Sequence, residues 1–248
     1  MRLVDKFILY FFIHLDRDSI LSLIVEEHNI LSAKWLQQKW FGSVLHCLSR
    51  EALFTLIHQK KLWGASESVS GPGSTMKATQ AIRNELPILL NKFKIASILD
   101  IPCGDFNWMK HADLRQIDYT GAEIVKALVD ENNDLFGNQN RKFVLLDIVK
   151  DNLPERDLIL CRDCLVHLDN HEVSKALQNI KNSGSKFLLT TTFPNQSENI
   201  KPGKDHWRPI NLQKKPFNLP PPVLLIREDE EDHRYADKSL GLWSIKDL

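Results

Sequence analysis

The chain contains Ser97-Ile-Leu-Asp-Ile-Pro-Cys-Gly-Asp-Phe-Asn-Trp-Met109, and this stretch decides its fold. A short apolar run ends in Asp100, and a turn of small residues follows. A buried parallel strand has this appearance when it delivers a carboxylate to the edge of a sheet, where the backbone must approach a ligand closely. The stretch therefore predicts an α/β fold with a ligand site after its first strand.

Apolar runs alternate with helical segments from residue 95 onward. This alternation predicts right-handed crossovers and a doubly wound, mostly parallel sheet. A proline-rich stretch follows Phe193, and two final apolar runs joined by the charged Glu228–Lys238 predict a terminal antiparallel hairpin. The seven predicted strands are Ile95–Leu99, Tyr119–Ile124, Lys142–Asp147, Asp157–Arg162, Ser185–Thr192, Pro222–Arg227 and Ser239–Ile245, and two predicted helices are Lys126–Asn133 and Asn170–Lys181.

Two segments precede this core. Residues 1–62 show apolar residues at helical spacing, which predicts a helical N-terminal extension beside a main domain at 63–248. Residues 63–75 are small and flexible, so they predict a loop, and Ser74–Arg83 predicts an N-capped helix after it. Two interpretations of the loop remain open: a plain linker, or a lid whose backbone N–H groups bind an anionic group.

Composition indicates an ordinary globular protein, with 248 residues, 43% hydrophobic and 26% charged. Lys plus Arg equals Asp plus Glu at 32 each, which argues against nucleic acid as a partner. The N-terminal apolar run Phe7–Leu15 is too short for a bilayer, which needs about 20 residues, and no small-residue cleavage site follows it. We therefore expect a cytoplasmic protein without a membrane span.

The four cysteines predict reduced thiols rather than a disulfide framework. Cys161 and Cys164 form a CxxC, but no second CxxC or CxxH pair completes a four-ligand zinc site. No metal site is predicted.

The stretch around Asp100 resembles motif I of class I S-adenosylmethionine (SAM) methyltransferases, whose common form is Leu-Asp-x-Gly-Cys-Gly-x-Gly. Leu99, Asp100, Cys103 and Gly104 match, while Pro102 and Phe106 stand where glycines are usual. The resemblance implies the Rossmann-like methyltransferase fold, a seven-stranded sheet that ends in an antiparallel hairpin. It covers about residues 63–248.

The same resemblance implies SAM as cofactor and S-adenosylhomocysteine (SAH) as product. It places the turn after Asp100 near the methionine end, Glu123 on the ribose hydroxyls and Asp147 on the adenine amino group. These three acids lie 23 and 24 residues apart in turn, each interval being one strand–helix–strand unit. The predicted cofactor-binding residues are Asp100, Pro102, Cys103, Gly104, Glu123, Ile124, Asp147, Ile148 and Arg162.

The segment Asp157–Leu168 resembles the strand and Leu-x-His-Leu turn of many small-molecule methyltransferases. It makes Asp163 and His167 the candidate catalytic pair, in which the carboxylate orients a histidine base. A histidine that only packs against its neighbours is the open alternative, since alignment of the reactants can suffice. Candidate substrate-binding residues are Asn195, Trp207 and Arg208.

The expected function is methyl transfer to a small polar acceptor, at an oxygen of a sugar, nucleotide-sugar or phosphorylated precursor of a surface polysaccharide. The surface-polysaccharide part rests on resemblance alone. The alternatives are a non-catalytic SAM-binding or partner-binding protein, and a methyltransferase acting on protein or RNA. A nicotinamide enzyme is disfavoured because Gly-x-Gly-x-x-Gly is missing. The expected partner is a small-molecule acceptor, and a homodimer is compatible with the sequence.

Overall fold

The computed structural model describes residues 49–63, 66–114, 116–202, 207–228 and 235–248. The chain divides into two compact units, Met1–Leu53 and Phe54–Leu248. Helix α4, Arg50–Lys60, is the first described element. The helices predicted within residues 1–48 lie outside the described residues, and the domain boundary at residue 62 stays a prediction.

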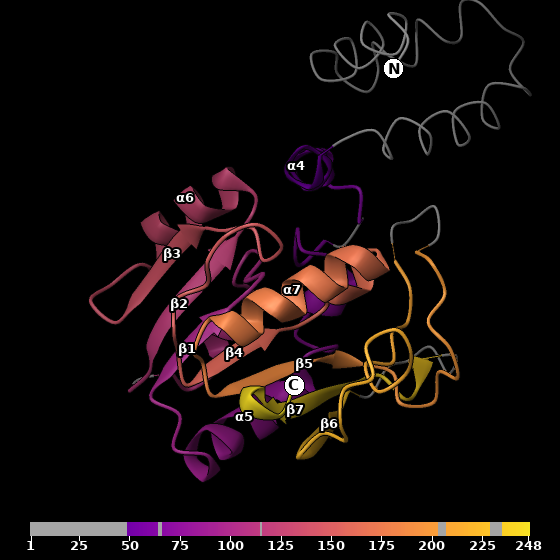
Figure 1. Cartoon of the computed structure of the whole chain (residues 1–248). Coiled ribbons are helices and arrows are strands. Elements are labelled where there is room, and N and C mark those ends of the chain that lie inside the picture. Colours follow the sequence, from indigo (N-terminus) through magenta and orange to yellow (C-terminus); the bar gives the residue numbers. More distant parts are fainter. Residues whose placement is uncertain (1–48, 64–65, 115, 203–206, 229–234) are drawn as a thin grey trace, which may run out of the picture. The chain divides into compact units, whose positions relative to one another are not determined.

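Seven strands form one sheet in the order β3-β2-β1-β4-β5-β7-β6 (Figure 1). Strands β1 to β5 pair in parallel, β7 is antiparallel to β5, and β6 is antiparallel to β7. The predicted doubly wound sheet with a terminal antiparallel hairpin is confirmed. The strands are Ser97–Asp100 (β1), Asp118–Glu123 (β2), Arg141–Leu145 (β3), Leu158–Cys161 (β4), Phe187–Thr192 (β5), Leu224–Arg227 (β6) and Ser239–Ser244 (β7).

Successive side chains of the central strands enter two different apolar clusters, because residues along a strand point alternately to its two faces. Ile98 of β1 packs with helix α5 (Gln80–Lys92), whereas Leu99 packs with helix α7 (Asn170–Asn182). Figure 1 shows α7 running across one face of the sheet. Burial on both faces explains why these strands are continuous apolar runs.

The helices α6, Lys126–Phe136, and α7 begin at the predicted residues. Helix α7 has a capping box, in which the Asp169 carboxylate accepts from the backbone N–H of Glu172 at 2.8 Å. The helix predicted at Ser74–Arg83 is wrong at its start. Thr75 Oγ1 accepts from the N–H of Ala78 at 3.2 Å, but the cap closes only a turn, and α5 begins at Gln80.

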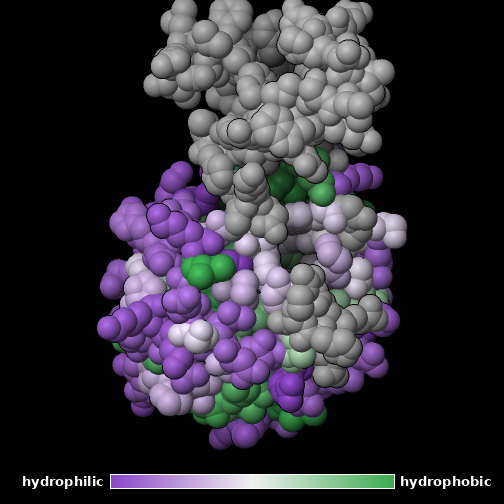
Figure 2. All heavy atoms as spheres, turned by 90° about the vertical axis from the view of Figure 1, so that its right-hand side faces the viewer, coloured by the Kyte–Doolittle hydropathy of each residue, from purple (hydrophilic) through white to green (hydrophobic). Residues whose placement is uncertain are grey.

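The surface of the described chain is mainly hydrophilic on the side shown in Figure 2, with hydrophobic residues at the lower end of the view and in smaller patches elsewhere. No helix among the described residues is long and apolar enough to cross a bilayer. The thiols of Cys103, Cys161 and Cys164 are free. Within the same residues, no cluster of three or more acidic, histidine or cysteine side chains could hold a metal ion.

Candidate functional site

The strand order reverses at β1, which has β2 on one side and β4 on the other. In doubly wound sheets this switch point opens a crevice at the carboxyl ends of the strands, where ligands bind. Asp100 ends β1, Glu123 ends β2, and Arg162 follows β4. These three predicted site residues therefore meet at one edge of the sheet.

The turn after β1 needs a glycine at position 104. Gly104 has a φ of 56°, and a Cβ atom there would lie 2.3 Å from Ser70 Oγ. Phe106 stands at a position where the motif usually has glycine, and its φ is 55°. Its side chain is buried and packs in a cluster of aromatic rings. Its ring centroid lies 5.2–5.3 Å from those of Tyr119, Phe136 and Phe143. The departure from glycine thus fills the core below the turn.

Glu123 is held by backbone donors. Its Oε1 accepts from the N–H groups of Ile124 at 2.8 Å and Val125 at 3.3 Å, and its Oε2 accepts from Gly104 at 3.2 Å. Burial raises the pKa of Glu123, and the backbone hydrogen bonds oppose that shift. A carboxylate has about four acceptor sites, so these three bonds leave capacity for a further donor.

Asp100 is buried and accepts a 2.5 Å hydrogen bond from the Tyr119 hydroxyl. Burial raises the pKa of Asp100 to about 7, although the Tyr119 bond and the charge of Arg162 both lower it. The carboxyl group therefore changes its charge near neutral pH.

Asp147 lies two residues beyond β3 and is buried. Its Oδ1 accepts from the N–H of Val149 at 2.9 Å, while Oδ2 lies 3.7 Å from Lys150 Nζ. Ile148 is buried in the cluster that contains α7 residues. The first three strands thus bring the predicted acids to one edge, in the order of the sequence.

Residues 66–75, here called the strap, are bound to the turn after β1. The Asp105 carboxylate accepts from Ser68 Oγ at 2.8 Å, from the N–H of Val69 at 2.9 Å and from Ser70 Oγ at 3.2 Å. On the other side, the Gly73 carbonyl accepts from Arg162 Nη2 at 2.8 Å. The strap therefore contacts both the turn after β1 and the residue after β4. The linker and lid interpretations of this loop both stay predictions.

Four charged side chains form a network at the end of β4. Arg162 Nε donates to Glu228 Oε1 at 2.7 Å, and Nη1 lies 3.2 Å from Asp163 Oδ2. Lys238 Nζ donates to the same Asp163 oxygen at 2.9 Å and lies 3.6 Å from Glu228 Oε2. Glu228 and Lys238 were not predicted as site residues, because they stand in a charged run that indicates a solvated turn.

Asp163 follows β4 with a φ of 51°. Lys238 and Arg162 hold its pKa below the usual range against the effect of burial, and His167 contributes in the same direction. His167 ends a 3-10 turn, Leu165–His167, rather than standing on a helix that begins at Asp163. Its ring centroid lies 5.6 Å from that of Trp63 and 6.1 Å from that of Phe54. The roles of Asp163 and His167 in catalysis stay predictions.

The three candidate substrate residues differ in exposure. Arg208 is 1% exposed, and its guanidinium donates to the carbonyls of Leu168 at 3.0 Å and of Ile200. Trp207 packs against Tyr235, with ring centroids 4.8 Å apart. Asn195 is exposed, and its N–H donates to Asp237 at 2.7 Å. The contacts of Arg208 are those of a brace between loops, and substrate binding by the three residues stays a prediction.

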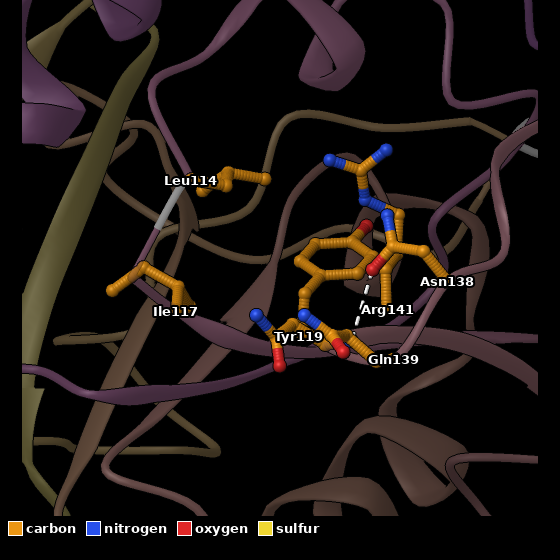
Figure 3. Close-up of a pocket in the computed structure, with 7 residues that line it drawn as sticks. Leu114, Ile117, Tyr119, Asn138, Gln139 and Arg141 are labelled. Carbon is orange, nitrogen blue, oxygen red and sulfur yellow. Dashed lines mark hydrogen bonds between the residues drawn. The ribbon is translucent and has the colours of Figure 1, made fainter.

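A separate pocket of about 480 Å³ lies at the opposite edge of the sheet, where β2 and β3 begin (Figure 3). Its apolar part comes from Leu114, Ile117 and the Tyr119 ring. The other lining residues are Asn138, Gln139, Asn140 and Arg141. The pocket is distant in the fold from the carboxyl-end crevice, although the Tyr119 hydroxyl reaches Asp100.

Comparison with known proteins identifies the fold. No protein-family model and no curated protein matches the chain. Among solved structures, the methyltransferase domain of bacterial CtHen1-C has a TM-score of 0.50 at 11% identity, covering 67% of this chain and 98% of that one. TehB from Haemophilus influenzae has a TM-score of 0.50 at 14% identity, covering 65% of this chain and 61% of that one.

An S-adenosylmethionine-dependent methyltransferase from Clostridium acetobutylicum ATCC 824 matches at a TM-score of 0.41 and 16% identity, over 48% of this chain. The chain spans 53% of the length of that protein. Together with the strand order, the similarity to the first two structures shows that this chain has the fold of the methyltransferase domain of bacterial CtHen1-C and of TehB.

Proposed function

We propose that the chain is a SAM-dependent methyltransferase that acts on an oxygen of a small polar acceptor. The observation that carries this proposal is a row of three buried acids beside the Gly104 turn: Asp100 and Glu123 at the ends of β1 and β2, and Asp147 two residues beyond β3. A nicotinamide dinucleotide would instead need a glycine-rich approach for its pyrophosphate, and the turn Pro102–Asn107 lacks that pattern.

The residues present fit the cofactor. Glu123 is positioned by three backbone donors and retains acceptor capacity for ribose hydroxyls. Asp147 would accept from the adenine amino group, and the turn at Cys103 and Gly104 would face the methionine end. Bound SAM supplies an electrophilic methyl group for transfer to a nucleophile.

In the proposed reaction the acceptor hydroxyl must lose its proton as the new bond forms. His167 would take that proton, and the negative charge of Asp163 would favour the resulting imidazolium. Since Lys238 and Arg162 keep Asp163 ionised, this carboxylate is a weak base and serves to orient and stabilise.

We further propose that the acceptor is a sugar, a nucleotide-sugar or a phosphorylated precursor of a surface polysaccharide. Trp207, a candidate substrate residue that is partly exposed, would offer an aromatic surface on which a sugar face could pack. Localisation in the cytoplasm and assembly as a homodimer are further parts of this proposal that rest on the sequence.

The test is a product assay with the full chain and labelled SAM, run against neutral sugars, nucleotide-sugars and sugar phosphates. SAH release that requires one of these acceptors would support the proposal. Binding of SAM with no methylated product from any acceptor, protein or RNA fraction would favour the non-catalytic alternative.

A further inference from the structure

We propose that Glu228 and Lys238 are positioning residues that hold Arg162 in the orientation by which it fastens the strap across the carboxyl ends of β1 and β4. The hydrogen-bond geometry alone supports the fastening. Its consequence for cofactor exchange rests on the proposed function.

The orientation of Arg162 is fixed from two sides. Its side chain is 5% exposed, so its charge needs partners inside the protein. Its Nε donates to Glu228 Oε1 at 2.7 Å, and its Nη1 lies 3.2 Å from Asp163 Oδ2. A guanidinium is a rigid planar fork, so two fixed edges direct Nη2 to the Gly73 carbonyl, 2.8 Å away.

Lys238 supplies the second positive charge beside the carboxylates of Asp163 and Glu228, which would otherwise share Arg162 as their one cation in the described part of the chain. Its ammonium contacts Asp163 at 2.9 Å and lies 3.6 Å from Glu228, and its side chain is 7% exposed. Among the described residues the cluster pairs two cations with two anions, so charges that are largely withdrawn from water have opposite charges beside them. Both positioning residues flank the turn between β6 and β7, so the C-terminal hairpin supplies half of the cluster.

Glycine at position 73 allows the strap to approach this cluster closely. A Cβ atom there would lie 3.1 Å from Asp163 Oδ2 and 3.8 Å from Lys238 Nζ. The other end of the strap is bound by Asp105, which follows β1. The strap is thus fastened on both sides of the switch point, where a ligand must enter.

Hydrogen–deuterium exchange of the free full-length protein tests this fastening. In Glu228→Gln, the loss of one anion leaves Arg162 poorly oriented, so we expect strap amides at 66–75 to exchange at least about tenfold faster. Exchange in β1 and β4 should stay as in the wild type. Lys186→Met is the matched control, because it removes an ion pair with Asp157 at the other end of β4.

Arg162→Lys decides the question if Glu228→Gln fails to fold. A lysine keeps the charge opposite Glu228 but cannot reach three acceptors at once, so the strap should be released in the same way. Lys238→Arg preserves the charge and should keep strap exchange close to that of the wild type. The proposal would be overturned if strap amides exchanged at the wild-type rate in both Glu228→Gln and Arg162→Lys. It would also be overturned if amides throughout the domain exchanged faster by the same factor as those of the strap.

SAH binding separates this inference from the proposed function. If the wild type binds SAH, the dissociation rate should rise about tenfold in Glu228→Gln. If the wild type does not bind SAH while strap exchange still rises in the variant, the fastening holds and the proposed function fails.

Discussion

The two halves of the carboxyl edge are built in different ways. On the β1–β3 side, Glu123 is held by Gly104, Ile124 and Val125, at most 19 residues away along the chain. On the β4–β7 side, Arg162 contacts Glu228 and Gly73, which are 66 and 89 residues away. A site held by near neighbours can be found from local sequence pattern, whereas one assembled from distant segments cannot.

The two halves also differ in charge balance. Asp100 and Glu123 are buried with raised pKa values, and their hydrogen-bond donors are a hydroxyl and backbone N–H groups. Asp163 has two cationic partners and a lowered pKa. Burial raises the pKa of a carboxyl group unless a cation offsets it. On the proposed function, we expect the β1–β3 side to bind the ligand that brings hydroxyl donors and positive charge.

Of the variants that test this difference between the two sides, removal of the Glu123 carboxylate should change cofactor affinity most. We expect Glu123→Ala to weaken SAM binding by two orders of magnitude or more, since hydrogen bonds to a charged acceptor are worth about 1.5–3 kcal/mol each. Calorimetric titration measures the affinity. Asp118→Ala, at the other end of the same strand, is the control and should bind as the wild type does. Wild-type affinity in Glu123→Ala would end the cofactor assignment.

A variant of Arg208 distinguishes two roles for this residue on the β4–β7 side: holding two loops together, or binding the substrate. Arg208→Met leaves the carbonyls of Leu168 and Ile200 without their donor, so we expect a loss of about 2–3 kcal/mol in the free energy of unfolding. Urea denaturation measures that loss, and SAM affinity should not change. Stability equal to the wild type would return Arg208 to the candidate substrate ligands.

We expect cofactor affinity to depend on pH through Asp100. Its pKa of about 7 means that the carboxyl is neutral at pH 6 and ionised at pH 8. A positively charged ligand prefers the ionised form, so SAM affinity should fall about tenfold from pH 8 to pH 6. Asp100→Asn should bind weakly at both pH values. A pH-independent affinity in the wild type would contradict the assignment of Asp100.

Asp100 should affect the stability of the free protein in the opposite direction, since the free energy of unfolding should fall as the pH rises. A pKa raised from 3.8 to about 7 by folding adds stability below pH 4, and that stability is lost as the pH rises through 7. The free protein should thus lose up to about 4 kcal/mol of this contribution between pH 4 and pH 8. Tyr119→Phe removes a bond that lowers the pKa, so the loss should shift to higher pH in denaturation curves.

His167 should have the smallest effect on cofactor affinity, because its ring neighbours are Trp63 and Phe54. We expect His167→Ala to change SAM affinity less than about threefold and, once an acceptor is found, to lower kcat more than it raises KM. Unchanged kcat would make His167 a packing residue, and a tenfold loss of SAM affinity would place it on the cofactor.

The fold could be predicted from the sequence because the central strands are apolar runs, and an acidic residue or a turn marks where each run ends. The predicted strand ends lie within two residues of the observed ones, for example Asp118–Glu123 against Tyr119–Ile124. The start of α5 was missed because Thr75 makes a cap hydrogen bond without a helix after it. A local cap signal does not reveal where the helix will continue.

The candidate site was predictable only in part, for a similar reason. Asp100 and Glu123 end their strands and Asp147 lies two residues beyond β3, so the period of the strand–helix units indicates these three acids. Glu228 and Lys238 stand in a charged run whose usual place is solvent, yet both are buried here, Glu228 against Arg162 and Lys238 against Asp163. The pairing of β7 with β5 brings Glu228 and Lys238 to the end of β4.

Calorimetric titration of the purified full chain with SAM, SAH and NAD tests the central claim most directly. The account predicts micromolar binding of SAM and SAH and none of NAD, because the acids at the strand ends accept ribose and amino donors while the turn lacks a pyrophosphate cradle. Binding of NAD alone, or of none of the three, would contradict it.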